Sequence, residues 1–204
     1  IAEGPVIQEA NLRSLAQGTT TDKVFELTKK LSGRVDTPLV YMTYLNVLFK
    51  YGYDKFLQNA KDAGISGVIV PDLPYEEKDE LQSVAEKYDI DVISLIAPTS
   101  EDRIKMIASD AKGFIYTVSS MGVTGMRNEI KTDLQSIVSH IKSVTDVPVA
   151  IGFGINKPQQ AKEFSAYADG VIVGSAIVNI VAEHGKDAPE YVFDYVKSMK
   201  DAIR

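Results

Sequence analysis

Six short runs of hydrophobic residues, rich in valine and isoleucine, recur along this chain, and turn residues bound each run. Their hydrophobic character is continuous instead of alternating, which is typical of strands in a parallel sheet that is covered on both faces. We therefore expect six buried strands. They are Pro38–Tyr44, Gly67–Pro71, Asp91–Ile96, Gly113–Val118, Pro148–Ile151 and Gly170–Val173.

Segments with helical spacing lie between these runs. In Glu101–Ala111, for example, Ile104, Ile107 and Ala108 repeat at intervals of three and four, as a helix that covers a sheet requires. Strict alternation of strand and helix predicts a parallel sheet whose right-handed crossovers place the helices on the outer face. The other expected helices are Ala10–Gln17, Thr21–Leu31, Tyr53–Ala63, Tyr75–Tyr88, Lys131–Val144, Pro158–Ala166 and Pro189–Ile203.

The alternation alone fits either a doubly wound sheet or a barrel, and the loops favour the barrel. In a (β/α)₈ barrel, phosphate often binds to the loops after the last two strands and to a short extra helix. Here Gly152-Phe153-Gly154 follows one strand and Gly174-Ser175 follows the next, with a short helix expected at Ala176–Val181. We therefore predict a single α/β domain over residues 1–204, with TIM-barrel architecture.

Both glycine-bearing turns are candidates for phosphate binding. Glycine lets backbone N–H groups approach phosphate oxygens, and the N-terminus of a helix attracts an anion. A single Gly-x-Gly is more often only a tight turn, and Gly174-Ser175 alone could be a helix cap. Their joint occurrence after the last two strands favours a phosphate site.

Further candidates lie where the other strands end. The polar loop Met121–Glu129 is long enough to act as a lid, and the alternative is a surface connection. Tyr44, Asn46 and Asp72 follow the first two strands, although each could equally be a loop cap. Tyr116 would be an inward-facing phenol in a barrel. We expect these residues to share one rim.

Composition narrows the classes of function. Twenty-two basic and 28 acidic residues give a net charge of −6, which disfavours nucleic-acid binding. No hydrophobic run approaches the length of a membrane span. The absence of cysteine excludes thiolate chemistry and fits a cytoplasmic location. His140 and His184 are expected on the surface, and no cluster has metal-ligand or nucleophile spacing, so neither metal nor covalent catalysis is expected.

Six motifs occur in the order found in tryptophan synthase α subunits, and the chain resembles that family over essentially all 204 residues. The resemblance implies a barrel enzyme, a carbon–carbon lyase of tryptophan biosynthesis. It would cleave indole-3-glycerol phosphate to indole and glyceraldehyde 3-phosphate by a retro-aldol step, without a metal or cofactor of its own. It also implies an α2β2 complex with a β subunit that holds pyridoxal phosphate (PLP). The motifs are Ala2-Glu3-Gly4-Pro5-Val6-Ile7-Gln8, Met42-Thr43-Tyr44-Leu45-Asn46, Val70-Pro71-Asp72-Leu73-Pro74, Gly122-Val123-Thr124-Gly125, Gly152-Phe153-Gly154 and Gly174-Ser175-Ala176-Ile177-Val178.

The resemblance also implies roles for individual residues. Glu3 and Tyr116 are the implied catalytic residues: Glu3 matches a loop carboxylate that accepts a hydrogen bond from the indole N–H, and Tyr116 lies with Tyr44 on the polar rim. Thr124 matches a lid threonine. The indole pocket would be lined by Ile7, Met42, Pro71 and Ile172. The implied phosphate cradle consists of Gly125, Gly152, Gly154, Gly174 and Ser175, and Phe153 is a further implied substrate-binding residue.

Two departures from the family pattern change what we expect of this chain. The loop carboxylate is usually aspartate, and Glu3 is one methylene longer. The family's general acid/base is a glutamate at the end of the second barrel strand, and this sequence begins in the loop after that strand. We therefore expect an incomplete barrel of strands 3–8, whose open edges at Pro38–Tyr44 and Gly170–Val173 are covered by another chain, by rearrangement or by upstream peptide. Loss of a general acid/base costs about 10²–10⁴ in rate, so little activity is expected.

Two alternatives remain open. A different phosphate-binding TIM barrel, an isomerase or a synthase, would share the cradle but not the indole pocket. Alternatively, the chain could act as a non-catalytic partner of a PLP-dependent β subunit, with the Asp72–Pro74 loop and the lid as the contacts.

Overall fold

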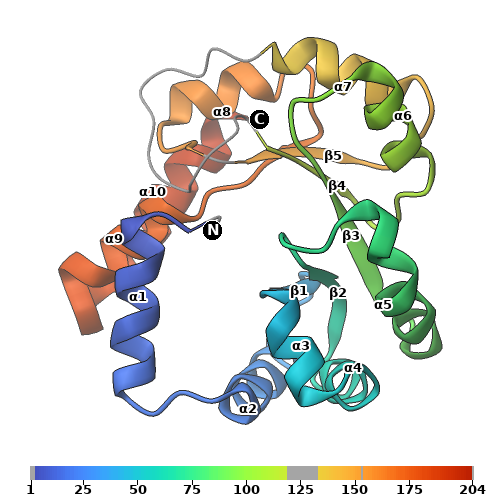
Figure 1. The fold of residues 1–204 in the computed structure, drawn as a ribbon. Helices are drawn as coiled ribbons and strands as arrows, with labels where there is room; N and C mark the ends of the chain where they lie inside the picture. Colours follow the sequence, from blue (N-terminus) through green and yellow to red (C-terminus); the bar gives the residue numbers. More distant parts are fainter. Residues whose placement is uncertain (1–2, 119–132, 153, 204) are drawn as a thin grey trace.

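The computed structural model describes residues 3–118, 133–152 and 154–203, in which helices surround a curved sheet (Figure 1). The strands are β1 (Leu39–Met42), β2 (Ile65–Ile69), β3 (Asp91–Ile96), β4 (Ile115–Val118), β5 (Val149–Gly152) and β6 (Gly170–Val171). The α-helices are α1 (Pro5–Ala16), α2 (Thr21–Ser32), α3 (Leu45–Tyr51), α4 (Tyr53–Asp62), α5 (Lys78–Ala85), α6 (Glu101–Ser109), α7 (Leu134–Lys142), α8 (Pro158–Phe164), α9 (Ser175–His184) and α10 (Ala188–Ala202). Short 3-10 helices are η1 (Tyr75–Glu77), η2 (Glu86–Tyr88) and η3 (Gly185–Asp187).

The six strands form one sheet in the order β1-β2-β3-β4-β5-β6, and each neighbouring pair is parallel. This confirms the predicted α/β fold with six parallel strands. Because every crossover passes outside the sheet, all six carboxyl ends meet at the same rim. In the register at the middle of the sheet, Leu95 of β3 lies beside Tyr116 of β4, which lies beside Ala150 of β5.

Local sequence explains where several helices begin. The Thr20 hydroxyl accepts a hydrogen bond from the backbone N–H of Lys23, and the Ser100 hydroxyl accepts one from Arg103. Such caps satisfy N–H groups that have no partner inside the helix. α1 begins at Pro5, earlier than the expected Ala10, because proline is well suited to the first turn of a helix.

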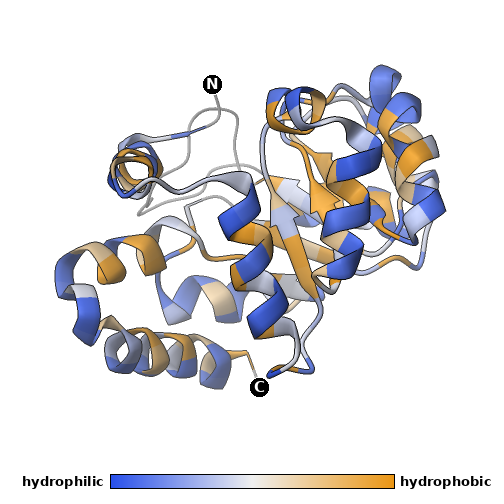
Figure 2. Ribbon diagram, turned by 90° about the horizontal axis from the view of Figure 1, so that it is seen from below, coloured by the Kyte–Doolittle hydropathy of each residue, from blue (hydrophilic) through white to orange (hydrophobic). Residues whose placement is uncertain are grey.

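Three groups of buried side chains hold the helices to the sheet. One lies under α2 to α5 and includes Phe56 and Leu57; the second lies under α6 to α8 and includes Ile104 and Ile141. The third, built on Ile69, Ile93 and Tyr116, fills the inner face of the curved sheet. Figure 2 shows hydrophobic residues on the strands and on the sides of the helices next to them. The candidate site therefore lies against the inner group.

The prediction that every strand is buried on both faces is wrong for β1 and β6. In β1 the side chains alternate, with Val40 37% and Met42 47% exposed, and both residues of β6 are half-buried. These strands are the edges of the described sheet, so one side of each has no neighbouring strand. The predicted strand at 91–96 has the observed bounds, whereas β2 begins and ends two residues earlier than predicted and β4 begins two residues later.

Two other expectations need correction. α3 was not predicted, since its seven residues follow β1 almost directly and its sequence has little helical periodicity. The expected short helix before the last one extends further, as α9, to His184. Both histidines are partly exposed, which does not contradict the expected surface positions: His140 lies 3.5 Å from Glu101, and the His184 ring stacks on Tyr191 at 3.6 Å.

The space between the two edge strands is partly occupied by α1. This helix packs against α9 (Figure 1). Together with α2 and β1, it also lines a cavity of about 490 Å³. Its side chains Leu12 and Leu15 are 68% and 64% exposed. Across the described residues, each helix is too short or too polar to cross a bilayer.

Candidate functional site

A pocket of about 420 Å³ lies at the rim where the strands end. Its walls come from α1, from the ends of β1, β2 and β6, from β4 and from the start of α9. It is lined by nine residues expected at the site: Glu3, Ile7, Met42, Tyr44, Pro71, Tyr116, Ile172, Gly174 and Ser175. Segments that are distant in the sequence therefore converge on one cavity.

Other expected residues are placed differently. Gly152, the last residue of β5, and Gly154, which follows that strand, do not line this pocket. Thr124, Gly125 and Phe153 lie outside the described residues. Three lining residues were missed, Asn11, Thr43 and Val47. The helical spacing from Ile7 to Asn11 is the signal that could have identified one of them.

Part of the pocket wall suits an apolar, flat group. Ile7, Met42, Pro71 and Ile172 contribute hydrophobic surface from four different elements. Ile172 is held just after β6 by a 2.7 Å hydrogen bond from its N–H to the Ile151 carbonyl oxygen. A cavity with such walls and a few polar groups is typical of a small-molecule site.

The start of α9 supplies polar groups to the pocket. Gly174 is the N-cap and carries no side-chain cap, while its carbonyl oxygen accepts from the N–H groups of Ile177 and Val178. The first N–H groups of a helix have no partner inside it and favour an anion. A Cβ added at Gly174 would meet no atom within 4 Å, so open space lies beside this residue. The arrangement can accept a phosphate group.

Tyr116 lies on the inner face of β4 and is 6% exposed. Burial, and secondarily the nearby charge of Glu3, raises the pKa of its phenol to about 12. The phenol therefore remains protonated near neutral pH and can donate a hydrogen bond. The Glu3 backbone carbonyl accepts a 2.7 Å hydrogen bond from Gln8, which ties the opening loop to α1.

Gly152 has a role that its sequence motif did not reveal. A Cβ at this position would lie 2.2 Å from Cε2 of Tyr116 and 2.5 Å from its hydroxyl oxygen. The absence of a side chain at Gly152 therefore leaves room for the Tyr116 ring. Gly154, by contrast, has a φ of +89°, which is costly for residues with a Cβ.

Asp72 acts as a cap, which was one of the two interpretations of its sequence position. Its carboxylate oxygen Oδ1 accepts a 2.8 Å hydrogen bond from the N–H of Leu45, the first residue of α3. This bond ties the loop after β2 to the loop after β1. It thereby fixes the relative positions of Pro71 and Tyr44 on the rim of the pocket.

Substitution of Gly152 by alanine tests the packing of Tyr116. We expect Gly152→Ala to displace the ring and to lower the free energy of unfolding by about 1–3 kcal/mol, as overpacking does. Gly170→Ala is the matched control, because its Cβ would lie 3.8 Å from that of Ala150, an ordinary contact. Urea unfolding and the NMR signals of Tyr116 report both effects. Equal stability of the two variants would contradict the proposed packing.

Alkaline titration tests the environment of Tyr116. Its pKa in the folded chain, about 12, is higher than the ordinary value of 10.0. The protonated Tyr116 phenol therefore contributes to the free energy of unfolding in full below pH 10, and this contribution is lost as the pH rises toward 12. Tyr116→Phe should remove the part of the alkaline decline in unfolding free energy that the Tyr116 phenol causes. Glu3→Gln should lower the pKa of Tyr116. A phenol that titrates near 10 in the folded protein would rule out this environment.

Comparison with known proteins identifies the chain's relatives. Residues 1–204 match the family described as tryptophan synthase alpha chain. The tryptophan synthase alpha chain of Lacticaseibacillus casei is 49% identical over 203 residues, which cover 100% of this chain and 76% of that protein. The counterpart in Lactiplantibacillus plantarum is 46% identical over 204 residues, covering 100% of this chain and 77% of that one.

Solved structures agree with the sequence comparison. A structure from Aquifex aeolicus VF5 has a TM-score of 0.89 at 37% identity and covers 100% of this chain and 77% of that chain. Tryptophan synthase subunit alpha from Campylobacter jejuni has a TM-score of 0.85 at 38% identity, covering 98% and 79%. These findings confirm the resemblance that the six motifs indicated. The chain belongs to the tryptophan synthase alpha chain family.

Proposed function

We propose that this chain serves tryptophan biosynthesis by binding indole-3-glycerol phosphate in the rim pocket and cleaving it to indole and glyceraldehyde 3-phosphate. The observation that supports this most directly is the composition of that pocket. It combines apolar walls with the start of α9, and Glu3 and Tyr116 are its acidic and phenolic groups. A substrate with an indole ring and a phosphate matches both features.

The chemistry of the cleavage assigns roles to these residues. A proton adds to ring carbon C3, the hydroxyl of the adjacent glycerol carbon loses its proton, and the bond between the two carbons breaks to release indole and an aldehyde. Positive charge develops on the indole nitrogen before the bond breaks. The Glu3 carboxylate would stabilise this charge by accepting a hydrogen bond from the ring N–H, as electrostatic stabilisation requires. The Tyr116 phenol would donate to a substrate oxygen.

The start of α9 would hold the phosphate. Backbone N–H groups of Ser175 and its neighbours, together with the Ser175 hydroxyl, would donate to the phosphate oxygens. The turn Gly152–Gly154 and the residues Thr124 and Gly125 would complete the cradle and the lid. In this proposal, remote binding of the phosphate positions the indole ring against Pro71 and Ile172.

We further propose that β1–β6 correspond to strands 3–8 of a barrel and that the 204-residue chain turns over slowly by itself. Glu3 is the one carboxylate among the described residues that line the pocket. The cleavage needs one group to donate a proton to carbon and another to accept the hydroxyl proton. A further acid/base group, the glutamate that the family resemblance implies, would supply the second function.

The family also implies a partner protein and a cellular location for this chain. We propose that the chain docks onto a PLP-dependent β subunit through the Asp72–Pro74 loop and α3, to which Asp72 is bonded. Phe49 of α3 is 71% exposed and is available for such a contact. Co-elution with a β subunit would test this docking. A cytoplasmic location fits a chain without cysteine.

Substitution of Gly174 tests the proposed phosphate site. We expect Gly174→Ala to weaken binding of indole-propanol phosphate about tenfold, because the added methyl group takes up space that the phosphate needs. The affinity of Gly174→Ala for indole should not change. The control Gly33→Ala, where an added Cβ also meets no atom within 4 Å, should bind both ligands as tightly as the unchanged chain does. Calorimetric titration measures all four affinities. Equal loss of indole and of the phosphate ester would contradict a phosphate site at α9.

Turnover tests the proposed supply of protons. Indole release from indole-3-glycerol phosphate should be about 10²–10⁴ slower for the 204-residue chain than for the full-length Lacticaseibacillus casei relative. Glu3→Gln should reduce the remaining rate further, because a neutral amide does not stabilise the ring charge. A rate equal to that of the relative would refute the need for a further acid/base group.

A further inference from the structure

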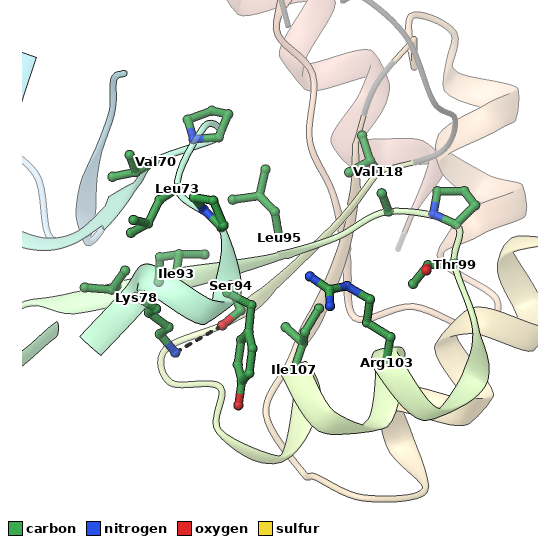
Figure 3. Close-up of a pocket in the computed structure, with 16 residues that line it drawn as sticks. Val70, Leu73, Lys78, Ile93, Ser94, Leu95, Thr99, Arg103, Ile107 and Val118 are labelled. Carbon is green, nitrogen blue, oxygen red and sulfur yellow. Dashed lines mark hydrogen bonds between the residues drawn. The ribbon is translucent and has the colours of Figure 1, made fainter. Parts of the chain in front are cut away.

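A second cavity of about 400 Å³ lies beside β3, between η1 and α5 on one side and α6 on the other (Figure 3). Its volume is close to that of the rim pocket and lies within the range typical of ligand sites. Pro71 is the residue that the two cavities share. The proposed lyase reaction makes no use of this second cavity.

The walls of this cavity are mainly hydrophobic. Leu73 from the loop after β2, Leu95 from β3 and Ile107 from α6 surround the space, and Val118 lies at the end of β4 (Figure 3). The cavity also lies between the two outer groups of buried side chains, because Val92 belongs to one and Ile107 to the other. An apolar body of a ligand would therefore be removed from water here.

The charged groups that line the cavity are both cations. Lys78 and Arg103 line it, and no Asp or Glu does so among the described residues. This is a local reversal in a chain whose net charge is −6. The carboxylates that pair with the two cations, Asp110 and Glu76, do not line the cavity. An anion entering the cavity would meet positive charge first.

Lys78 is buried to an unusual degree for a lysine, with its side chain 7% exposed. Its Nζ atom donates to Asp110 Oδ2 at 3.2 Å, to the Asp110 carbonyl oxygen at 3.3 Å and to Ser94 Oγ at 3.5 Å. Because the Ser94 oxygen accepts from Lys78, its own hydrogen must point elsewhere. The Ser94 hydroxyl can therefore donate its hydrogen to a further acceptor.

Arg103 adds a second group of donors. Its two terminal nitrogens donate to Glu76 at 2.7 and 3.2 Å, which leaves three of the five guanidinium N–H groups beyond that pair. Figure 3 shows the guanidinium extending from α6 toward the side of β3 that carries Ser94. The Thr99 hydroxyl also lines the cavity. Guanidinium groups and hydroxyls match the planar, acceptor-only geometry of a carboxylate.

We propose that this cavity is a binding site for a small carboxylate with an apolar body. The carboxylate accepts hydrogen bonds from Arg103 and Ser94, and the apolar body packs against Leu73 and Ile107. The hydrophobic walls favour such a molecule over a compact inorganic anion, which would lose its hydration without gaining enough donors. This site is independent of the lyase reaction, since none of its polar groups lines the rim pocket.

Titration of the 204-residue chain with 4-phenylbutyrate and with its uncharged amide, 4-phenylbutyramide, followed by methyl NMR, tests the proposal. We expect saturable shifts of the Leu73 and Ile107 methyl groups with the carboxylate and at least about tenfold weaker binding of the amide. The methyl groups of Ile7 and Ile172, in the rim pocket, should not shift. Shifts that appear only there, or equal affinities of acid and amide, would overturn the proposal.

Two variants and a matched control separate the polar contacts from general charge. Arg103→Gln and Ser94→Ala should each weaken 4-phenylbutyrate binding, Arg103→Gln by about tenfold or more. Lys105→Gln removes an equal charge from the same helix, but Lys105 pairs with Glu101 and does not line the cavity. The affinity of Lys105→Gln for 4-phenylbutyrate should equal that of the unchanged chain. If Lys105→Gln weakens binding as much as Arg103→Gln does, the carboxylate is attracted by surface charge and the site is refuted.

Discussion

The packing of the Tyr116 ring against Gly152 is the contact on which the inner face of this molecule depends. Parallel pairing of β4 with β5 brings the two residues together, and the ring would collide with any side chain at Gly152. With the ring fixed there, the buried phenol faces the rim and has a raised pKa. Glu3, near the start of the sequence, then lies close enough for its charge to act on that phenol. The chemistry of the rim pocket therefore depends on a steric fit.

Two groups of donors stand out in an acidic chain, and they are built differently. At the start of α9 the donors are backbone N–H groups, which cost no side-chain entropy to position and suit a phosphate. Beside β3 the donors are the side chains Arg103 and Ser94, held in place by Glu76 and Lys78. The first group of donors faces the rim pocket, and the second group faces the second cavity, beside β3. The loop after β2, with Pro71, separates them.

Sequence patterns predicted the strands and helices well where burial is uniform. Observed β3 has the predicted bounds and the other middle strands lie within two residues of theirs, whereas the predicted ends of the edge strands β1 and β6 extend too far. α3 was missed because part of its stability comes from a cap by Asp72, which no local pattern reveals. The motifs located most of the rim pocket. They could not reveal the contact of Gly152 with Tyr116 or the burial of Lys78, because both depend on residues far away in the sequence.

The central claim is that a single ligand spans the rim pocket, with its ring against the apolar wall and its phosphate at α9. A crystal structure of the chain with indole-propanol phosphate tests this most directly. The account predicts phosphate oxygens within hydrogen-bonding distance of the Ser175 N–H, and the indole N–H directed at the Glu3 carboxylate. A ligand bound in the reverse orientation, or at a different place on the protein, would contradict it.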